Sequence, residues 1–194
     1  MRYLLLLWIT TSIYAQTSPN HKNTNLKVAY FASGCFWCVE AIYESVPGVK
    51  SAVSGYAGSS VKNPTYKTIK NTGHAETVAV YYNPKKVTFK NLVDIYYASQ
   101  NPTTLGQNPD FGKNYRSIIF YSTKREQNIA WDKFKEINKA FKGKAVTAIE
   151  PIDTFYPAED YHQNFEKRNP NHPYIKAVSI PRLNRFKTNY FKTQ

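Results

Sequence analysis

The sequence predicts an α+β fold, a two-layer sandwich of ferredoxin-like type in which helices cover a mixed sheet, followed by a long irregular C-terminal segment. The first supporting observation is composition, because 194 residues with 42% hydrophobic and 15% aromatic content can bury a core. The second is the order of the periodic segments, strand–helix–strand–strand–helix–strand–helix–strand. No internal repeat or compositional boundary interrupts that order, so we expect one domain over residues 16–194.

The first half of the domain contains three predicted strands and two predicted helices. Residues 26–32 have the apolar run of a buried strand, and residues 36–46 have apolar positions at helical spacing. Residues 49–56 and 76–82 are predicted strands bounded by residues typical of turns. Thr88 is an N-cap candidate for a helix with a regular apolar face. These elements give the first strand–helix–strand–strand–helix unit.

The second half begins with a long polar loop that contains two prolines and two glycines, and loops of this length are often functional. Residues 116–121 are the next predicted strand. Thr123 and Glu126 form a capping-box pattern that begins a helix, and residues 145–150 are the last predicted strand. Five prolines follow residue 150, and for that reason we expect an irregular segment that wraps the surface.

Residues 1–15 have the features of a secretory signal peptide. A short positive start is followed by an apolar run, and Ala15 precedes a plausible cleavage point before Gln16. The run is too short to span a bilayer comfortably, although an uncleaved anchor or a buried strand is an alternative. We therefore expect the protein to be exported, either to the periplasm or out of the cell, and to have no stable membrane association after cleavage. We also expect it to be a monomer.

The chain is strongly basic, with 26 Lys and Arg against 13 Asp and Glu and a formal charge of +13. Such a balance is compatible with a basic binding module that recognises nucleic acid or acidic surfaces. The basic residues are nevertheless spread along the chain, with modest crowding only at 124–125 and 182–192. A solvated basic surface explains this distribution better, and we expect no nucleic-acid partner.

The only two cysteines, Cys35 and Cys38, stand where a strand passes into a helix. The partial positive charge of a helix N-terminus favours a thiolate, so Cys35 is a candidate nucleophile. One helical turn brings Cys38 beside it, where a disulfide could form locally. Two buried structural thiols and a thioredoxin-like oxidoreductase are alternatives. Bulky aromatic residues between the cysteines argue against the latter, because they wall a pocket.

The cysteine motif is one of five motifs that together resemble the peptide methionine sulfoxide reductase A family. The resemblance runs from about residue 27 to 165 and is to the variant with a second cysteine inside the first motif. The motifs, in order, are Gly34-Cys35-Phe36-Trp37-Cys38, Asn63-Pro64-Thr65-Tyr66, Gly73-His74-Ala75-Glu76, Asp110 with Tyr115-Arg116-Ser117, and Phe155-Tyr156-Pro157-Ala158-Glu159-Asp160-Tyr161-His162-Gln163.

The resemblance implies reduction of methionine S-sulfoxide, free or in oxidised proteins, and thus protein repair under oxidative stress. Cys35 is implied to attack the sulfoxide sulfur and become a sulfenic acid. Glu76 is implied to protonate the departing oxygen, which requires a raised pKa. Cys38 is implied to resolve the intermediate as a disulfide, which thioredoxin or a similar dithiol reopens. No metal, flavin or nucleotide is implied.

The remaining residues of the implied site bind the substrate. Tyr66 and Tyr115 are implied to donate hydrogen bonds to the sulfoxide oxygen, as an oxyanion hole does. Asp110 is implied to orient neighbouring groups through an ordered water. Phe36 and Trp37 are implied to form an apolar recess for the terminal methyl group of the substrate.

Two features depart from the family pattern. The family usually has His-Asp-Pro before the Asp110 loop, where this chain has Gln100-Asn101-Pro102, and the loop is one residue shorter. The chain also lacks the C-terminal cysteines that some members use for recycling. Cys38 is therefore the sole candidate for the resolving thiol, while the placement of Asp110 depends on the altered loop.

Overall fold

The computed structural model describes residues 25–191, so the predicted signal peptide at 1–15 lies outside the described residues. The centre of the fold is a six-stranded sheet with the strand order β5-β4-β1-β3-β2-β6. The strands are β1 (Lys27–Ala32), β2 (Val49–Ala57), β3 (Ala75–Tyr82), β4 (Ile118–Tyr121), β5 (Ala148–Pro151) and β6 (Tyr156–Pro157).

The longer helices join these strands, and shorter helical turns lie in the loops. The longer helices are α1 (Phe36–Glu44), α3 (Phe89–Ala98), α4 (Lys124–Ala140) and α6 (Ile180–Phe191). The short elements are α2 (Ile69–Thr72), α5 (Phe165–Arg168), two 3₁₀ turns η1 (Lys113–Tyr115) and η2 (Asp160–His162), and a π-helical turn η3 (Ile175–Ser179).

The sheet confirms the predicted α+β class and ferredoxin-like type. Strands β4, β1, β3 and β2 pair antiparallel in that order, and α1 and α3 provide the two helical connections of the unit. Strand β5 adds to β4 in parallel after the α4 crossover, which makes the sheet mixed. The predicted order of the eight principal elements is therefore the observed order.

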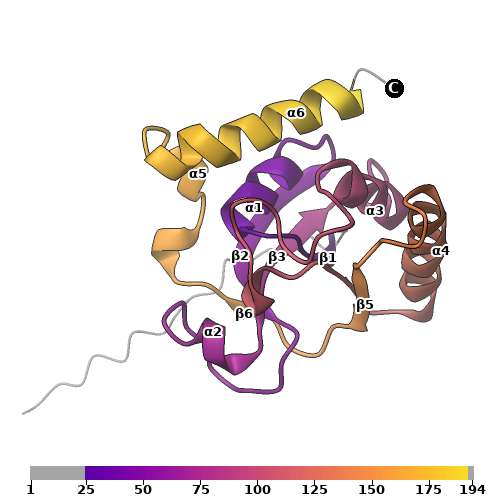
Figure 1. Cartoon of the computed structure of the whole chain (residues 1–194), viewed down its shortest axis with the longest axis horizontal. Coiled ribbons are helices and arrows are strands. Elements are labelled where there is room, and N and C mark those ends of the chain that lie inside the picture. The colour runs from indigo at the N-terminus through magenta and orange to yellow at the C-terminus, as the bar shows by residue number, and fades with distance from the viewer. Residues whose placement is uncertain (1–24, 192–194) are drawn as a thin grey trace, which may run out of the picture.

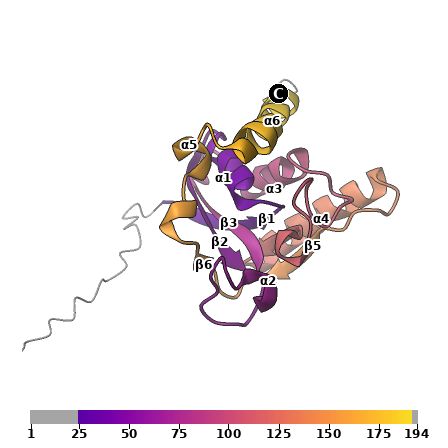
Figure 2. The same cartoon turned by 60° about the vertical axis from the view of Figure 1, so that its left-hand side comes forward.

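Helices α1, α3 and α6 lie together on one side of the sheet, with α6 crossing over α1 (Figures 1 and 2). Alternate residues of the strands, among them Phe31, Val78 and Val80, point into the main core on this side and are fully buried. Glu76 has the same parity as Val78 on β3, so its side chain enters this apolar layer. The pleat of β3 therefore directs a carboxyl group into the helix-covered side of the sheet.

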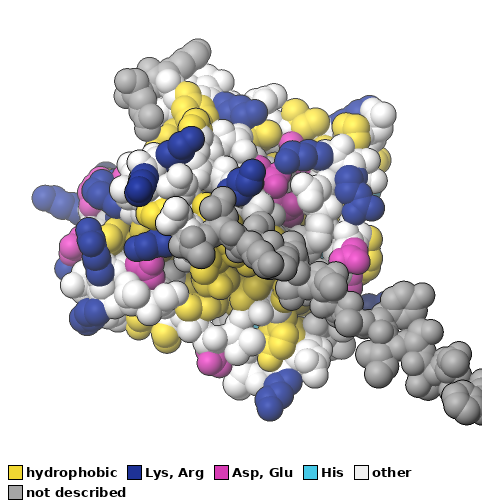
Figure 3. Space-filling view, turned by 180° about the vertical axis from the view of Figure 1, so that it is seen from behind, with side chains coloured by type: hydrophobic (Ala, Val, Ile, Leu, Met, Phe, Trp, Pro, Cys, Tyr) yellow, Lys and Arg dark blue, Asp and Glu magenta, His cyan; other side chains and the backbone are white. Residues whose placement is uncertain are grey.

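The other side of the sheet carries a smaller apolar cluster around Ile118 and Phe120, covered in part by Ile152 and Phe155 from the segment after β5. Figure 3 shows that Lys and Arg side chains are scattered over this rear face, which does not present one continuous basic patch. Within residues 25–191, no helix is long and apolar enough to cross a membrane.

The C-terminal segment corrects the prediction in part, because it is helical over Ile175–Ser179 and Ile180–Phe191. The prolines suggested an irregular path, but Pro181 stands where the π-helical turn passes into α6. Pro181 lies inside a continuous helical run and has no N–H to donate, and the π-helical turn immediately before it is the local distortion that accommodates such a residue. Leu183 and Phe186 face the main core, and this packing stabilises the helix.

Candidate active site

Cys35 is the N-cap residue of α1, immediately after the strand β1 and the turn at Gly34. Gly34 has a φ of 72°, and its N–H donates to the carbonyl of Tyr115 at 3.1 Å. A side chain at this position would also meet Cβ of Gln107 at 2.9 Å. Glycine is thus required both by the left-handed backbone and by the loop packed against it. The turn fixes where the sulfur of Cys35 points.

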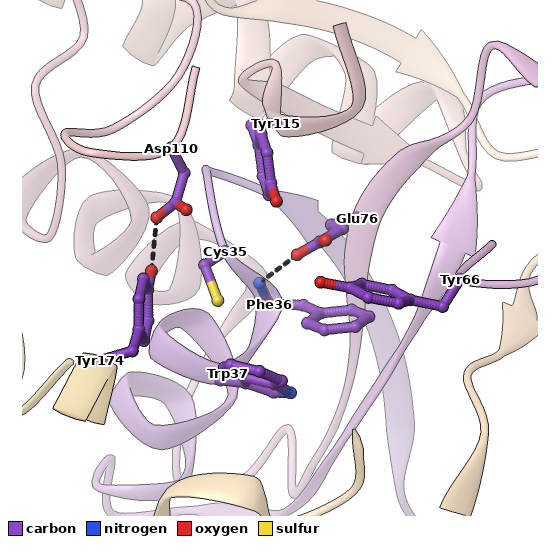
Figure 4. A pocket seen from close by; sticks show the side chains of 8 residues that line it. All are labelled: Cys35, Phe36, Trp37, Tyr66, Glu76, Asp110, Tyr115 and Tyr174. Carbon is purple, nitrogen blue, oxygen red and sulfur yellow. Dashed lines mark hydrogen bonds between the residues drawn. The ribbon is translucent and has the colours of Figure 1, made fainter. Parts of the chain in front are cut away.

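Cys35 opens on a cavity of about 120 Å³ (Figure 4). This volume is well below that of typical ligand pockets, so the cavity accepts the end of a side chain rather than a large molecule. The cavity is lined by seven of the eight residues that were singled out from the sequence. The eighth, Cys38, is buried and does not line it. The lining residues are Cys35, Phe36, Trp37, Tyr66, Glu76, Asp110, Tyr115 and Tyr174.

Glu76 lies at the apolar end of the cavity, and its side chain is only 2% exposed. Burial raises the pKa of Glu76 to about 8, and the charges of Asp110 and Cys38 add to this effect. One interaction opposes the shift, since the backbone N–H of Phe36 donates to Oε2 of Glu76 at 3.0 Å. The carboxyl group therefore keeps its proton near neutral pH while it stays tied to the first turn of α1.

The two neighbouring thiols respond in opposite directions to their surroundings. Burial, the adjacent Cys38 and then Glu76 raise the pKa of Cys35. A hydrogen bond from Cys35, together with Arg182 and Ser179, lowers the pKa of Cys38 to about 6 despite burial. The first N–H of α1 is occupied by Glu76 and does not stabilise a thiolate. The surroundings therefore disfavour a thiolate on Cys35 and favour one on Cys38.

Tyr66 and Tyr115 approach the cavity from two different loops, and Figure 4 shows both hydroxyl groups on the Glu76 side of it. Burial and the nearby Glu76 raise the pKa of Tyr66 to about 12 and also raise that of Tyr115. Both phenols consequently remain hydrogen-bond donors. Glu159 holds the backbone of Tyr66 in place by accepting its N–H at 3.0 Å, and also accepts the hydroxyl of Tyr56 at 2.8 Å.

Asp110 reaches the cavity despite the altered loop before it. A tight turn brings it there, because Gln107 and Asp110 exchange backbone hydrogen bonds of 3.0 and 2.6 Å. The side chain of Gln107 braces this turn by accepting the N–H of Asn101 at 2.8 Å. Burial raises the pKa of Asp110, against the effect of a hydrogen bond from Tyr174. In this chain, hydrogen bonds of the Gln107 backbone and side-chain amide therefore hold the loop, although the His-Asp-Pro sequence usual in the family is missing.

Tyr174 is a lining residue that the sequence reasoning missed. Its hydroxyl donates to Asp110 and lies 3.7 Å from Sγ of Cys38, so it joins the loop carboxylate to the thiol pair. Tyr174 precedes the π-helical turn η3, 139 residues after Cys35. It belongs to none of the five motifs and is one of 16 tyrosines, so the sequence alone contained no signal for it.

Trp37 forms one wall of the cavity and is held by aromatic contacts. Its ring stacks on Phe165 with the centroids 3.7 Å apart and 7° between the planes. Its indole Nε1 donates to Nδ1 of His162 at 3.2 Å. Burial lowers the pKa of His162, whose neutral ring can accept this bond. The motif around His162 was recognised in the sequence, but its role as the support of Trp37 was not.

The arrangement combines a nucleophilic sulfur, a protonated carboxyl group and phenolic donors around a small recess with aromatic walls. Within the part of the chain that the structure describes, no group of three or more His, Cys, Asp and Glu side chains is placed to hold a metal ion. The two thiols lie one helical turn apart, close enough to exchange a proton or to form a disulfide. The fold and the site together define a thiol-dependent oxidoreductase.

Comparison with known proteins identifies the family. The family model described as peptide methionine sulfoxide reductase matches residues 27–194. The chain is 42% identical over 167 residues to peptide methionine sulfoxide reductase MsrA 1 of Rhodopirellula baltica, covering 84% of this chain and 87% of the relative. The chain therefore belongs to the peptide methionine sulfoxide reductase family, which are oxidoreductases that act on methionine sulfoxide.

Solved structures agree with this assignment. The reduced form of Mxr1 from Saccharomyces cerevisiae superimposes with a TM-score of 0.71 at 31% identity, over 77% of this chain and 88% of the yeast chain. A structure of the same yeast protein in complex with Trx2 has a TM-score of 0.55 at 27% identity, over 74% and 86% of the two chains. Methionine sulfoxide reductase A of Corynebacterium diphtheriae has a TM-score of 0.69 at 31% identity, over 77% of each chain, so the fold is that of a solved methionine sulfoxide reductase.

Proposed function

We propose that this protein reduces the S epimer of methionine sulfoxide, free or within oxidised proteins, with Cys35 as nucleophile, Glu76 as general acid and Cys38 as resolving thiol. The observation that carries the proposal is the position of Glu76. Its carboxyl group keeps a proton near neutral pH and lines the same small cavity as Cys35. A sulfoxide placed between them has a nucleophile at sulfur and an acid at oxygen.

The first step transfers oxygen from the substrate to Cys35. As the sulfur of Cys35 attacks the sulfoxide sulfur, its proton passes to the thiolate of Cys38, which is hydrogen-bonded to it. Glu76 gives its proton to the sulfoxide oxygen, so the attack leaves a bond between the two sulfur atoms and a hydroxyl group on the substrate sulfur. The hydroxyl oxygen then passes to the sulfur of Cys35, as its bond to the substrate sulfur and the bond between the two sulfur atoms both break. The products are methionine and a sulfenic acid on Cys35, so the substrate gains the two electrons that Cys35 loses.

The substrate-binding residues complement the charge and the shape of the sulfoxide group. The hydroxyl groups of Tyr66 and Tyr115 donate to the oxygen as negative charge builds on it. Phe36 and Trp37 receive the terminal methyl group, and the stacked support behind Trp37 keeps that wall rigid. Asp110, tied to Tyr174, orients polar groups at the opposite end of the cavity.

The second step regenerates the enzyme. The thiol of Cys38 displaces the hydroxyl group of the Cys35 sulfenic acid, water leaves, and a Cys35–Cys38 disulfide forms. The local helical turn permits this bond, since residues three apart on a helix lie on one face. A thioredoxin-like dithiol then reduces the disulfide and becomes oxidised itself. The complex of the yeast relative with Trx2 supports a partner of this class.

The test uses peptides that carry either pure epimer of methionine sulfoxide, with dithiothreitol as reductant. We expect consumption of the S epimer only, and complete loss of it in Cys35→Ser. A control variant, Ser45→Ala, removes a hydroxyl at the other end of α1 and should keep full activity. Preference for the R epimer, or turnover in Cys35→Ser, would contradict the proposal. A thioredoxin-like enzyme would instead reduce the disulfides of insulin.

We also propose that the protein is exported, works as a monomer and carries no tightly bound membrane anchor once residues 1–15 are removed. The apolar run and the small residue before Gln16 support this proposal. N-terminal sequencing of protein recovered from the producing cell should begin at Gln16. A mature chain that begins at Met1 in the cytoplasmic fraction would contradict it.

A further inference from the structure

Arg182 is a buried cation behind the two thiols. It lies on α6, which crosses over α1 (Figure 1), and its side chain is only 6% exposed. Its guanidinium donates to the carbonyl and the hydroxyl oxygen of Ser33, and to the carbonyl of Ser99, each at 3.0 Å. A Cβ built on Gly34 would lie 3.5 Å from its Nη1. The guanidinium thus sits against the turn that presents Cys35.

No carboxylate forms an ion pair with Arg182 anywhere in residues 25–191, although five other ion pairs occur there. All three of its hydrogen bonds go to neutral oxygens. A buried charge is costly unless a nearby opposite charge compensates for it. The fold must therefore offset this cation by negative charge in the site itself.

The thiol pair lies in the right place to supply that charge. Ser179, one turn before Arg182, donates its hydroxyl to Glu166 and lies close enough to Cys38 to lower the pKa of that thiol, so this face of the C-terminal helix lies on the second thiol. Arg182 lowers the pKa of Cys38 and of Asp110. Of the other titratable groups around the pair, Glu76 from β3 opposes a negative charge, and Tyr174 from the segment before η3 stays neutral but favours one by hydrogen bonding. None of the loop residues Asp110, Tyr66 and Tyr115 brings a positive charge.

We propose that Arg182 is a positioning residue of the reductase site, whose buried positive charge keeps one negative charge on the Cys35–Cys38 pair and whose hydrogen bonds to Ser33 fix the turn before Cys35. Among the described groups named as changing the pKa values of the two thiols, Arg182 is the one that carries a positive charge. Without it, burial and Glu76 act against a thiolate, and only neutral hydrogen-bonding groups such as Tyr174 remain to favour one. Neutral thiols react slowly, because thiolate is the reactive species and the proton acceptor for Cys35 would be lost.

This inference rests on the proposed function only for the statement that the pair is reactive, and its test needs no sulfoxide. The measurement is the rate of alkylation by iodoacetamide of the reduced protein against pH, with the modified cysteine assigned by mass spectrometry. In the wild type we expect reactivity to appear with a midpoint near pH 6. In Arg182→Gln the midpoint should rise by about one unit or more, and alkylation at pH 5, below both midpoints, should slow by about tenfold.

Two variants separate the charge from the packing. Arg182→Lys keeps the positive charge but loses the planar fork, so its midpoint should stay within about half a unit of the wild type. Arg185→Gln removes the same charge from an exposed position on the same helix, and should leave the profile unchanged. Thermal unfolding of each variant measures the structural contribution of the Ser33 contacts independently.

Overlapping alkylation profiles of Arg182→Gln and the wild type would overturn the proposal, whatever the loss of thermal stability. If Arg182→Gln does not fold, Arg182→Lys decides the question: a midpoint near that of an ordinary cysteine, about 8.5, would show that charge at this position does not control the thiols. A normal alkylation profile without sulfoxide reduction would instead refute the proposed function and leave the role of Arg182 standing.

Discussion

The backbone N–H of Phe36 donates to the Glu76 carboxyl group at 3.0 Å, so the acid occupies the first free donor of the helix that begins after Cys35. This bond fixes the distance between the acid and the nucleophile through the backbone rather than through a flexible side chain. It also withdraws from Cys35 the donor that would favour a thiolate at a helix N-terminus. The site therefore keeps a proton on the acid and places the charge on the second thiol.

Replacement of Glu76 by Gln should lower kcat by about 10²–10⁴-fold, because the amide keeps the bond from Phe36 but has no proton to give. The wild-type rate should also fall as the pH rises past about 8, when Glu76 ionises. That decline should be absent from the residual activity of Glu76→Gln. Steady-state kinetics between pH 5 and 9 would measure both effects, with exposed Glu136→Gln as the control. Unchanged kcat in Glu76→Gln would remove it from the mechanism.

Replacement of Cys38 by Ser should separate the two steps of the reaction. The variant should form about one methionine per protein molecule and then stop when thioredoxin is the reductant, because no disulfide can form. The first turnover should also be slower than in the wild type, since the thiolate that accepts the Cys35 proton is lost. Rapid-quench counting of methionine would show this. Sustained thioredoxin-driven cycling would contradict the resolving role.

Glu40 is a buried carboxyl group outside the cavity, and it should make stability depend on pH. It is 2% exposed, accepts the N–H of Asn164 at 2.6 Å and the hydroxyl of Ser54, and burial raises its pKa to about 7. The folded protein thus holds this proton over a pH range where the unfolded chain has lost it. The free energy of unfolding should fall as the pH rises from about 4.5 to 7, by roughly 3 kcal/mol from this group.

In Glu40→Gln this part of the pH dependence should disappear, because glutamine keeps the hydrogen bonds and does not titrate. Urea unfolding at several pH values would test the expectation. Glu44→Gln, one turn along α1 and paired with Lys167 at 2.5 Å, is the matched control. An identical slope in the wild type and Glu40→Gln would mean that this carboxyl group is ionised in the folded protein.

Replacement of His162 by Leu should loosen the wall formed by Trp37, because the buried indole N–H loses its acceptor. Leaving such a donor unsatisfied costs about 1–3 kcal/mol, so thermal stability should fall. KM should rise more than kcat falls, since Trp37 binds the methyl group and does not transfer protons. Tyr161→Phe, at an exposed neighbour, serves as the control. A loss in kcat alone would instead point to a direct role of His162 in the reaction.

Much of the fold and the site was determined by local patterns in the sequence. Alternation of apolar residues along β3 placed Glu76 with Val78 on one face, and the strand-to-helix transition at Gly34 placed Cys35 and Cys38 one turn apart. Such patterns depend on residues close in sequence. They sufficed for the order of the strands and helices and for the pairing of the two cysteines. The other cavity residues that were expected, such as Tyr66, Asp110 and Tyr115, came from the resemblance to the family.

Other properties were decided only by the tertiary structure. Tyr174 and Arg182 belong to a C-terminal segment that was predicted to be irregular because of its prolines but is partly helical. They lie near the thiol pair although more than 130 residues of sequence separate them from it. Which sulfur carries the charge depends on burial, on the donor taken by Glu76 and on that distant cation. Desolvation and long-range electrostatics arise only when the chain packs, and residue spacing contains no information about them.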